Sequence, residues 1–445
     1  MKRQDTAASV ALAIDTPGWL KRIDWLLLTA VVVTFVNGLV ISIWIFPAVS
    51  GPAGLVVGRS DGWVEIAENI LLGNGFVHSP DTPSATVTGQ LAREPVYALV
   101  LASILAAFGE LDPFMMLLQT LINSLTCLVL YFIARKTFNR RVALLACFLY
   151  AVYPFASWYV SRVAYETLLG FLVALLTLGL VYLFERLSLR RALMVGFLLG
   201  VVVLCKGTYL LFPFALLPGL MIRFGAKNRN VISCCLVVAL SMAALLSPWI
   251  MRNYLVSGEF VPVSSHGGIV FLLGNKVIES YSLRENTAGD LPGEESNKIY
   301  YELQNAIRSQ HPNLTHAQVE VQVDKQLIRM VIDDIIARPL KFIEKILKGL
   351  IFVWFLMDTG LKSTALLLLQ GPLVMACAVG IYYALKAHKQ VLPLLILLAY
   401  FILIQTSFLS FGRFSYPMVP ILIAFAAYAI EVFRFKYLHG RQPAA

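Results

Sequence analysis

An acidic residue near the start of the chain, Asp61, is the first candidate for chemistry. Only 26 of the 445 residues are Asp or Glu, whereas 58% are hydrophobic. Asp61 lies in the first polar stretch after an N-terminal apolar run, within VVGRSDGWVEIAENILLGNGF. An ionisable group at a membrane edge is costly to keep and is therefore a functional candidate. Its carboxylate could take a proton from a hydroxyl group as a general base.

The alternative for Asp61 is structural. Residues 61–72 have the apolar spacing of a short amphipathic helix, and Gly73–Asn74–Gly75 ends it. Asp is a favoured residue at a helix N-cap, where its carboxylate accepts a backbone N–H. Glu65 falls on the polar face of the same helix, where a solvated role is the simpler explanation.

Six basic residues are predicted at the same membrane surface as Asp61. They are Arg59, Arg93, Arg162, Lys206, Arg252 and Arg413. Each alone could simply be a long side chain that places its charge at the membrane–water interface. Together, on the side opposite the main basic clusters, they suit a bound anion such as a lipid-linked phosphate.

Other residues are candidates for contact with an acceptor or a sugar. These are Glu65, Glu94, Arg162, Glu166 and His266. For Glu166 the alternative is an ion pair with Arg162 at spacing i, i+4. His266 could join Asp61 and Glu94 at a metal, but nothing here has metal-ligand spacing. The sequence assigns no cofactor and leaves a divalent cation open.

These groups suit the transfer of a sugar from a polyprenyl phosphate. The phosphate leaves as an anion and needs no proton, so the two carboxylates of a glycoside hydrolase are unnecessary. One base for the acceptor hydroxyl, with cations at the departing phosphate, would suffice. On this hypothesis Asp61 is the base, and the attack inverts the anomeric centre.

Long apolar runs must position these residues. Segments such as 25–45, 113–134, 163–184 and 364–385 each carry about 20 residues, enough to cross a bilayer as a helix. The chain is therefore predicted to be an all-α polytopic membrane protein with about ten spans. We expect 25–46 as the first span, 113–248 as spans two to seven, and 364–434 as spans eight to ten. The termini, 1–24 and 435–445, are predicted in the cytoplasm, and 47–112 and 249–363 outside it.

The charge distribution supports this orientation. Lys and Arg outnumber Asp and Glu by 36 to 26, and many of them cluster at short breaks between apolar runs. This pattern orients membrane helices, so the basic excess does not indicate nucleic acid. Successive spans must alternate in direction, and the basic breaks must stay in the cytoplasm. Residues 95–109 and 341–357 should therefore lie along the outer surface of the membrane rather than cross the membrane. In the second loop, helices are expected near 293–310 and 315–337.

Several segments, in this order, resemble bacterial polytopic glycosyltransferases with the GT-C fold. They are SDGWVEIAENILLGNGF, REPVYALVLA, YPFASWYVSRVAYETLLGF, GVVVLCKGTYLLFPFALLPG, LSPWIMRNYLVSGEFVPVSSHGG and GRFSYPMVPIL. The group includes protein O-mannosyltransferases and lipid A aminoarabinose transferases. The resemblance implies a catalytic acid at Asp61 and phosphate-binding residues nearby, best matched by Arg59 and Arg93, then by Lys206, Arg252 and Arg413. The chain departs from the group at Gly62 and Glu94, where relatives carry Glu and Lys.

The sequence thus predicts an inverting glycosyltransferase of a cell inner membrane, with its active site on the periplasmic or extracellular face. Its partners would be a polyprenyl-phosphate-linked sugar, an envelope glycan, lipid or protein acceptor, and the bilayer. The alternatives are a transporter or flippase of lipid-linked sugars, and an oligosaccharide polymerase or ligase. Against transport stand the absence of charges in the middle of the predicted spans and of an internal repeat.

Overall fold

The computed structural model describes residues 24–45, 62–78, 91–281 and 291–439. Asp61 and Arg59 lie outside the described residues.

The described chain is built from helices and contains no strand. The first half comprises α1 (Trp25–Val40), η2 (Ile41–Ile45), α3 (Trp63–Leu71), α4 (Pro95–Phe108), α5 (Asp112–Thr137), α6 (Arg140–Val152), α7 (Pro154–Trp158), η4 (Tyr159–Ser161), α8 (Glu166–Glu185), α9 (Leu189–Cys205), η5 (Gly207–Tyr209) and α10 (Phe212–Phe224). The second half comprises α11 (Arg229–Ser257), α12 (Gly267–Ser280), α13 (Leu291–Gln310), α14 (His316–Ala337), α15 (Pro339–Phe355), α16 (Gly360–Lys386), α17 (Leu392–Ser407), η6 (Gly412–Met418) and α18 (Val419–His439).

The chain is a multi-pass membrane protein. Within the described residues, seven helical segments are long and apolar enough to cross a bilayer, and an eighth arises if the bent pair α6–α7 is one span. Two shorter apolar helices are α4 and α17. The predicted helical spans all fall on observed helices, while the count of ten spans and the orientation stay predictions.

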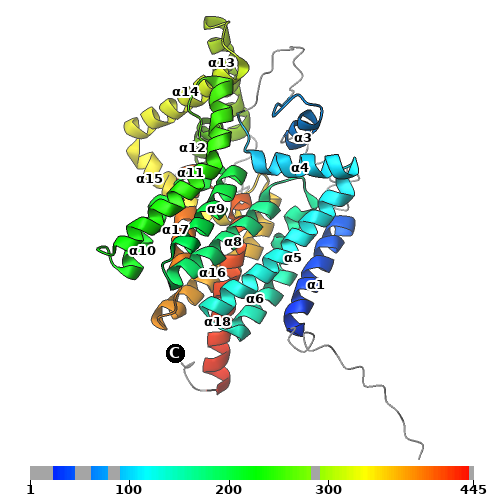
Figure 1. The fold of residues 1–445 in the computed structure, drawn as a ribbon, viewed down its shortest axis with the longest axis vertical. Helices are drawn as coiled ribbons and strands as arrows, with labels where there is room; N and C mark the ends of the chain where they lie inside the picture. Colours follow the sequence, from blue (N-terminus) through cyan, green and yellow to red (C-terminus); the bar gives the residue numbers. More distant parts are fainter. Residues whose placement is uncertain (1–23, 46–61, 79–90, 282–290, 440–445) are drawn as a thin grey trace, which may run out of the picture.

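Helix α4 does not continue the direction of its neighbours. Figure 1 shows it lying across one end of the bundle, close to α3, whereas α5 runs along the bundle. Its 14 residues span about 21 Å at 1.5 Å per residue, too little to cross a bilayer core of about 30 Å. Its length and direction agree with a helix that lies along a membrane surface, while the placement of residues 95–109 at the outer surface stays a prediction.

The helix pair α6–α7 is bent by 56° just before Pro154. Proline cannot donate a backbone hydrogen bond, so side chains from other helices satisfy carbonyls around the bend. Asn37 of α1 donates to the Ala151 carbonyl at 2.9 Å, and the Tyr416 hydroxyl donates to the Ala156 carbonyl at 2.6 Å. The bend is thereby held by helices from both ends of the chain.

Four helices, α12 to α15, gather at the same end of the bundle as α3 and α4 (Figure 1). Helices α12, α13 and α14 share a small apolar core that includes Leu272, Ile307, Val323 and Leu327. The expected helices near 293–310, 315–337 and 341–357 correspond to α13, α14 and α15. The helix α12 was not among the helices expected in this part of the chain.

Candidate functional site

The candidate site lies where several helices begin or break at one end of the bundle. Its centre is an aromatic pair, Trp63 at the first turn of α3 and Tyr165 just before α8. Their ring centroids are 6.2 Å apart and meet edge to face, and both side chains are buried. Tyr97 of α4 packs against Trp63 at 5.5 Å in the same manner. These rings fix the start of α3 against α4 and α8.

Three of the candidate basic residues gather around this aromatic pair. The guanidinium of Arg93 lies 5.5 Å from the Trp63 ring centroid. The Lys206 ammonium and the Arg413 guanidinium lie 4.9 and 5.8 Å from the centroid of Tyr165. Residues 93, 206 and 413 thus come together from the start of α4, the break between α9 and η5, and η6. The fold brings side chains from three distant parts of the chain to one place.

Two buried carboxylates accompany the cations. Glu94 is 6% exposed, and its Oε1 accepts a hydrogen bond of 3.2 Å from the Gly207 backbone and lies 3.9 Å from Lys206 Nζ. Glu166 is 1% exposed and forms an ion pair with Arg413, not with Arg162 at spacing i, i+4. The ion pair of Glu166 with Arg162, which the sequence offered as the alternative to a functional role, was therefore wrong, because the partner is Arg413.

Two polar groups in the cluster lack an expected partner among the described residues. Arg93 has no carboxylate partner among the described residues. The second carboxylate oxygen of Glu166, Oε2, is buried and accepts no hydrogen bond from a described residue. Buried polar atoms normally find a partner, so both groups remain able to bind one.

The imidazole of His266 belongs to the same cluster. His266 is half-buried at the N-terminus of α12, and the backbone N–H of Ser265 beside it donates to the Leu91 carbonyl near Arg93 at 2.7 Å. Burial, and then the positive charges of Arg93 and Lys206, lower the pKa of His266 to about 3. His266 is therefore neutral at physiological pH and can both donate and accept hydrogen bonds.

The ammonium of Lys206 keeps its proton. Burial alone would lower its pKa, but the Glu94 carboxylate and the Tyr165 hydroxyl outweigh burial and raise the pKa of Lys206. A narrow cavity of about 10 Å³ opens beside it, lined by Tyr165, Glu166, Lys206, Tyr209 and Arg413 among others. A permanent cation and a buried carboxylate thus face the same small space.

Three other candidates lie in different surroundings. Arg252 donates to the Phe76 carbonyl at 2.9 Å and stacks on Trp249, so it ties α11 to the segment after α3. Arg162 stacks on Trp158. Glu65 lies 2.7 Å from Nε2 of His78, a residue of the segment after α3.

No group of three or more His, Cys, Asp or Glu side chains among the described residues is arranged to hold a metal ion. His266 and Glu94 therefore do not form a metal site with other described residues. A site that includes Asp61 lies outside the described residues.

Sequence reasoning missed the residues that hold the cluster together. Nothing in the sequence singles out Tyr165 or Gly207, whose backbone N–H donates to Glu94. The atom nearest to a Cβ added at Gly207 would be Val263 Cγ1 at 3.4 Å, an ordinary contact, so packing does not require a glycine at this position.

Comparison with known proteins agrees with this architecture. Residues 92–251 match the sequence model of the dolichyl-phosphate-mannose-protein mannosyltransferase family. No curated protein sequence matches the chain.

Solved structures match over nearly the whole chain. One is the oligosaccharyltransferase AglB from Archaeoglobus fulgidus in complex with an inhibitory peptide and a dolichol-phosphate, with a TM-score of 0.58 and 15% identity over 96% of this chain and 53% of that one. The apo form of the Archaeoglobus fulgidus enzyme matches with a TM-score of 0.57 and 15% identity over 95% and 52%. ArnT from Cupriavidus metallidurans, bound to undecaprenyl phosphate, has a TM-score of 0.41 and 15% identity over 92% and 78%.

The chain spans about half the length of the archaeal structures. It has the GT-C fold, which confirms the fold class and the resemblance inferred from the sequence.

Proposed function

From this GT-C fold we propose that the protein is an inverting glycosyltransferase that uses a polyprenyl-phosphate sugar as its donor. The acceptor is an envelope glycan, lipid or protein. The observation that carries the proposal is the gathering of Arg93, Lys206 and Arg413 around Trp63 and Tyr165. Fixed cations of this kind can stabilise a departing phosphate in a partly dry site.

In the proposed reaction Asp61 removes the proton of an acceptor hydroxyl. The freed oxygen attacks the anomeric carbon, and the bond from that carbon to the phosphate oxygen breaks. The polyprenyl phosphate leaves with the bonding electrons as an anion, next to Lys206, Arg413 and Arg93. Attack opposite the leaving group inverts the anomeric configuration.

Chain connectivity supports Asp61 as the base. Asp61 is bonded to Gly62, and consecutive Cα atoms lie about 3.8 Å apart. The next residue, Trp63, is packed in the cation cluster and is 1% exposed. Gly62 has a positive φ of 73°, and a Cβ placed on it would lie 2.3 Å from the His78 ring, so the backbone beside Asp61 has a conformation suited to glycine.

The other candidate residues have supporting roles in this proposal. Glu166 Oε2 accepts a hydrogen bond from a hydroxyl of the sugar or acceptor, and Glu94 and the neutral imidazole of His266 line the approach. Arg59 is a further phosphate ligand, and Arg252 positions the segment that follows α3. The site faces the periplasm or cell exterior, with both termini in the cytoplasm.

The test is mass spectrometry of lipids that copurify with the wild type and with Asp61→Asn, followed by incubation with cell-envelope acceptors. General-base loss should slow turnover by about 10²–10⁴-fold while the donor stays bound. A polyprenyl-phosphate sugar that the variant retains and the wild type consumes supports the proposal.

Two outcomes would contradict it. Movement of an intact lipid-linked sugar across vesicles without a new glycosidic bond would identify a flippase. A strict requirement for a diphosphate-linked oligosaccharide would identify a polymerase or ligase.

A further inference from the structure

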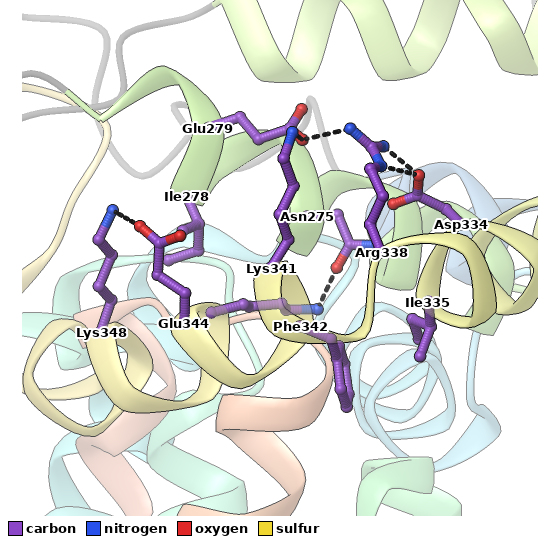
Figure 2. Close-up of a pocket in the computed structure, with 11 residues that line it drawn as sticks. Asn275, Ile278, Glu279, Asp334, Ile335, Arg338, Lys341, Phe342, Glu344 and Lys348 are labelled. Carbon is purple, nitrogen blue, oxygen red and sulfur yellow. Dashed lines mark hydrogen bonds and ion pairs between the residues drawn. The ribbon is translucent and has the colours of Figure 1, made fainter.

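A second and larger cavity lies away from the aromatic pair, between α12, the end of α14 and α15. Its volume is about 420 Å³. Figure 2 shows its polar lining, with Glu279 of α12 facing Arg338 and Lys341, and with Lys348 beside Glu344 on α15. None of these residues belongs to the candidate donor site.

The lining of the cavity carries more basic than acidic groups. The basic residues are Arg338, Lys341, Lys345 and Lys348, and the acidic residues are Glu279, Asp334 and Glu344. Arg338 pairs with Asp334, Lys341 lies 3.7 Å from Glu279, and Lys348 lies 2.6 Å from Glu344. One basic residue, Lys345, is left over.

Lys345 is 3% exposed, yet its charge has no carboxylate partner among the described residues. Its ammonium donates to Asn275 Oδ1 at 2.6 Å and to the Ser407 carbonyl at 2.8 Å, and it lies 5.0 Å from the Phe271 ring centroid. An ammonium has three donors, so one remains beyond these two bonds. A buried cation without a counter-ion is costly, and an anion in the cavity would offset that cost.

The opposite face of α15 is apolar and exposed. Leu340, Ile343, Leu347 and Ile351 recur at helical spacing and are 78%, 52%, 59% and 62% exposed. The helix packs against the membrane helices α16 and α17. An amphipathic helix with lysines on one face and leucine and isoleucine on the other is suited to lie in the membrane interface.

We propose that the cavity between α12 and α15 binds the phosphate headgroup of an anionic membrane lipid. The apolar face of α15 lies in the bilayer, which brings a lipid phosphate level with Lys341, Lys345 and Lys348. This site is separate from the donor site and does not depend on the proposed sugar transfer.

The cavity and the donor site share one chain segment. Lys345 binds the carbonyl of Ser407, and Arg413 of the donor site follows six residues later. Between them the backbone N–H of Gly412 donates at 2.7 Å to the carbonyl of Leu356, the residue that follows α15. A lipid phosphate bound at Lys345 would therefore lie beside a side chain that holds the backbone leading to Arg413.

The test is native mass spectrometry of the full chain in detergent, titrated with phosphatidylglycerol and with zwitterionic phosphatidylcholine. Phosphatidylglycerol should bind at least about tenfold more tightly. The double variant Lys341→Gln/Lys348→Gln, which changes two partly exposed side chains, should lose most of that preference, and Lys345→Met should do the same. The matched control is Lys276→Gln on α12, whose side chain pairs with Glu295 outside the cavity.

Two further measurements identify the source of the bound phosphate and the residue that binds it. Soluble glycerol phosphate should bind more weakly than the lipid, and equal binding would overturn a lipid as the occupant. Burial lowers the pKa of Lys345 to about 7, so binding of phosphatidylglycerol should weaken between about pH 6 and pH 8.5 as Lys345 loses its proton. Equal affinity of the double variant and the wild type would overturn the proposal, whatever the fate of sugar transfer.

Discussion

At the scale of single residues, the pair Glu166–Arg413 connects chemistry with stability. Glu166 is buried while Arg413 is about one-third exposed at its side chain. Removal of one residue of a buried ion pair leaves the other residue's charge without an opposite charge beside it. The pair therefore holds η6 against α8, and it also leaves one carboxylate oxygen available to a ligand.

We expect Glu166→Ala to lower the free energy of unfolding by about 3 kcal/mol, the low end for a broken buried pair, because Arg413 keeps partial access to solvent. Thermal or denaturant unfolding in detergent measures this. Glu166→Ala/Arg413→Met should recover part of the loss, since no uncompensated charge remains. A double variant no more stable than the single one would argue against an ion-pair origin.

His266 should make the protein sensitive to acid. Its folded pKa is about 3, below its ordinary value of 6.5, so between those values the unfolded chain binds a proton that the folded chain does not. Stability due to this group is complete above about pH 6.5 and falls as the pH drops toward 3, with a slope of up to about 1.4 kcal/mol per pH unit.

The pH dependence of unfolding for the wild type and His266→Gln tests this. The variant should have a flatter profile between about pH 6.5 and pH 4 and equal or lower stability at about pH 8. Parallel profiles would mean that His266 titrates normally in the folded protein.

At the scale of elements, glycines explain where sequence patterns failed. The segment that forms α12 contains Gly267, Gly268 and Gly274, residues that disfavour a helix, and no helix was expected there. In the structure a Cβ at Gly268 would lie 2.6 Å from the Asp324 carbonyl oxygen, and one at Gly274 would lie 1.6 Å from that of Phe408. These glycines permit close packing of a helix, and close packing depends on partners distant in sequence.

Gly274→Ala should therefore destabilise the protein by about 1–3 kcal/mol, as overpacking does. The matched control is Gly267→Ala on the same helix, because a Cβ added there would have no other atom within 4 Å. That variant should be neutral or slightly stabilising, since Ala favours helices over Gly. Unfolding midpoints compare the two, and an equal effect would mean that contact with Phe408 is unimportant.

Membrane helices and their approximate ends could be predicted from the sequence, because a bilayer imposes one length and one polarity on every span. The sequence places Arg93, Lys206 and Arg413 in breaks at the same predicted surface, but it does not show whether their side chains converge. Their partners were not foreseeable. Glu166 pairs with a residue 247 positions away, and no local pattern encodes that choice.

At the scale of the whole molecule, the proposed donor site joins helices from distant parts of the chain. A ligand that binds the folded protein alone raises its stability by about 2.7 kcal/mol at about 100 times the dissociation constant. Undecaprenyl phosphate should therefore raise the melting temperature. Lys206→Met should reduce the increase and Lys276→Gln should not, and an equal increase in both would exclude Lys206 from the phosphate site.

The long separation between Glu166 and Arg413 has a consequence for biogenesis. The ribosome releases α8 into the membrane well before η6 has been synthesised, so the nascent protein carries a carboxylate whose cation does not yet exist. Until the last helices insert, Glu166 must stay protonated, hydrated or held by an insertion factor. The proposed donor site is consequently among the last parts of the protein to assemble, and on this proposal a chain interrupted before η6 should not bind the donor lipid.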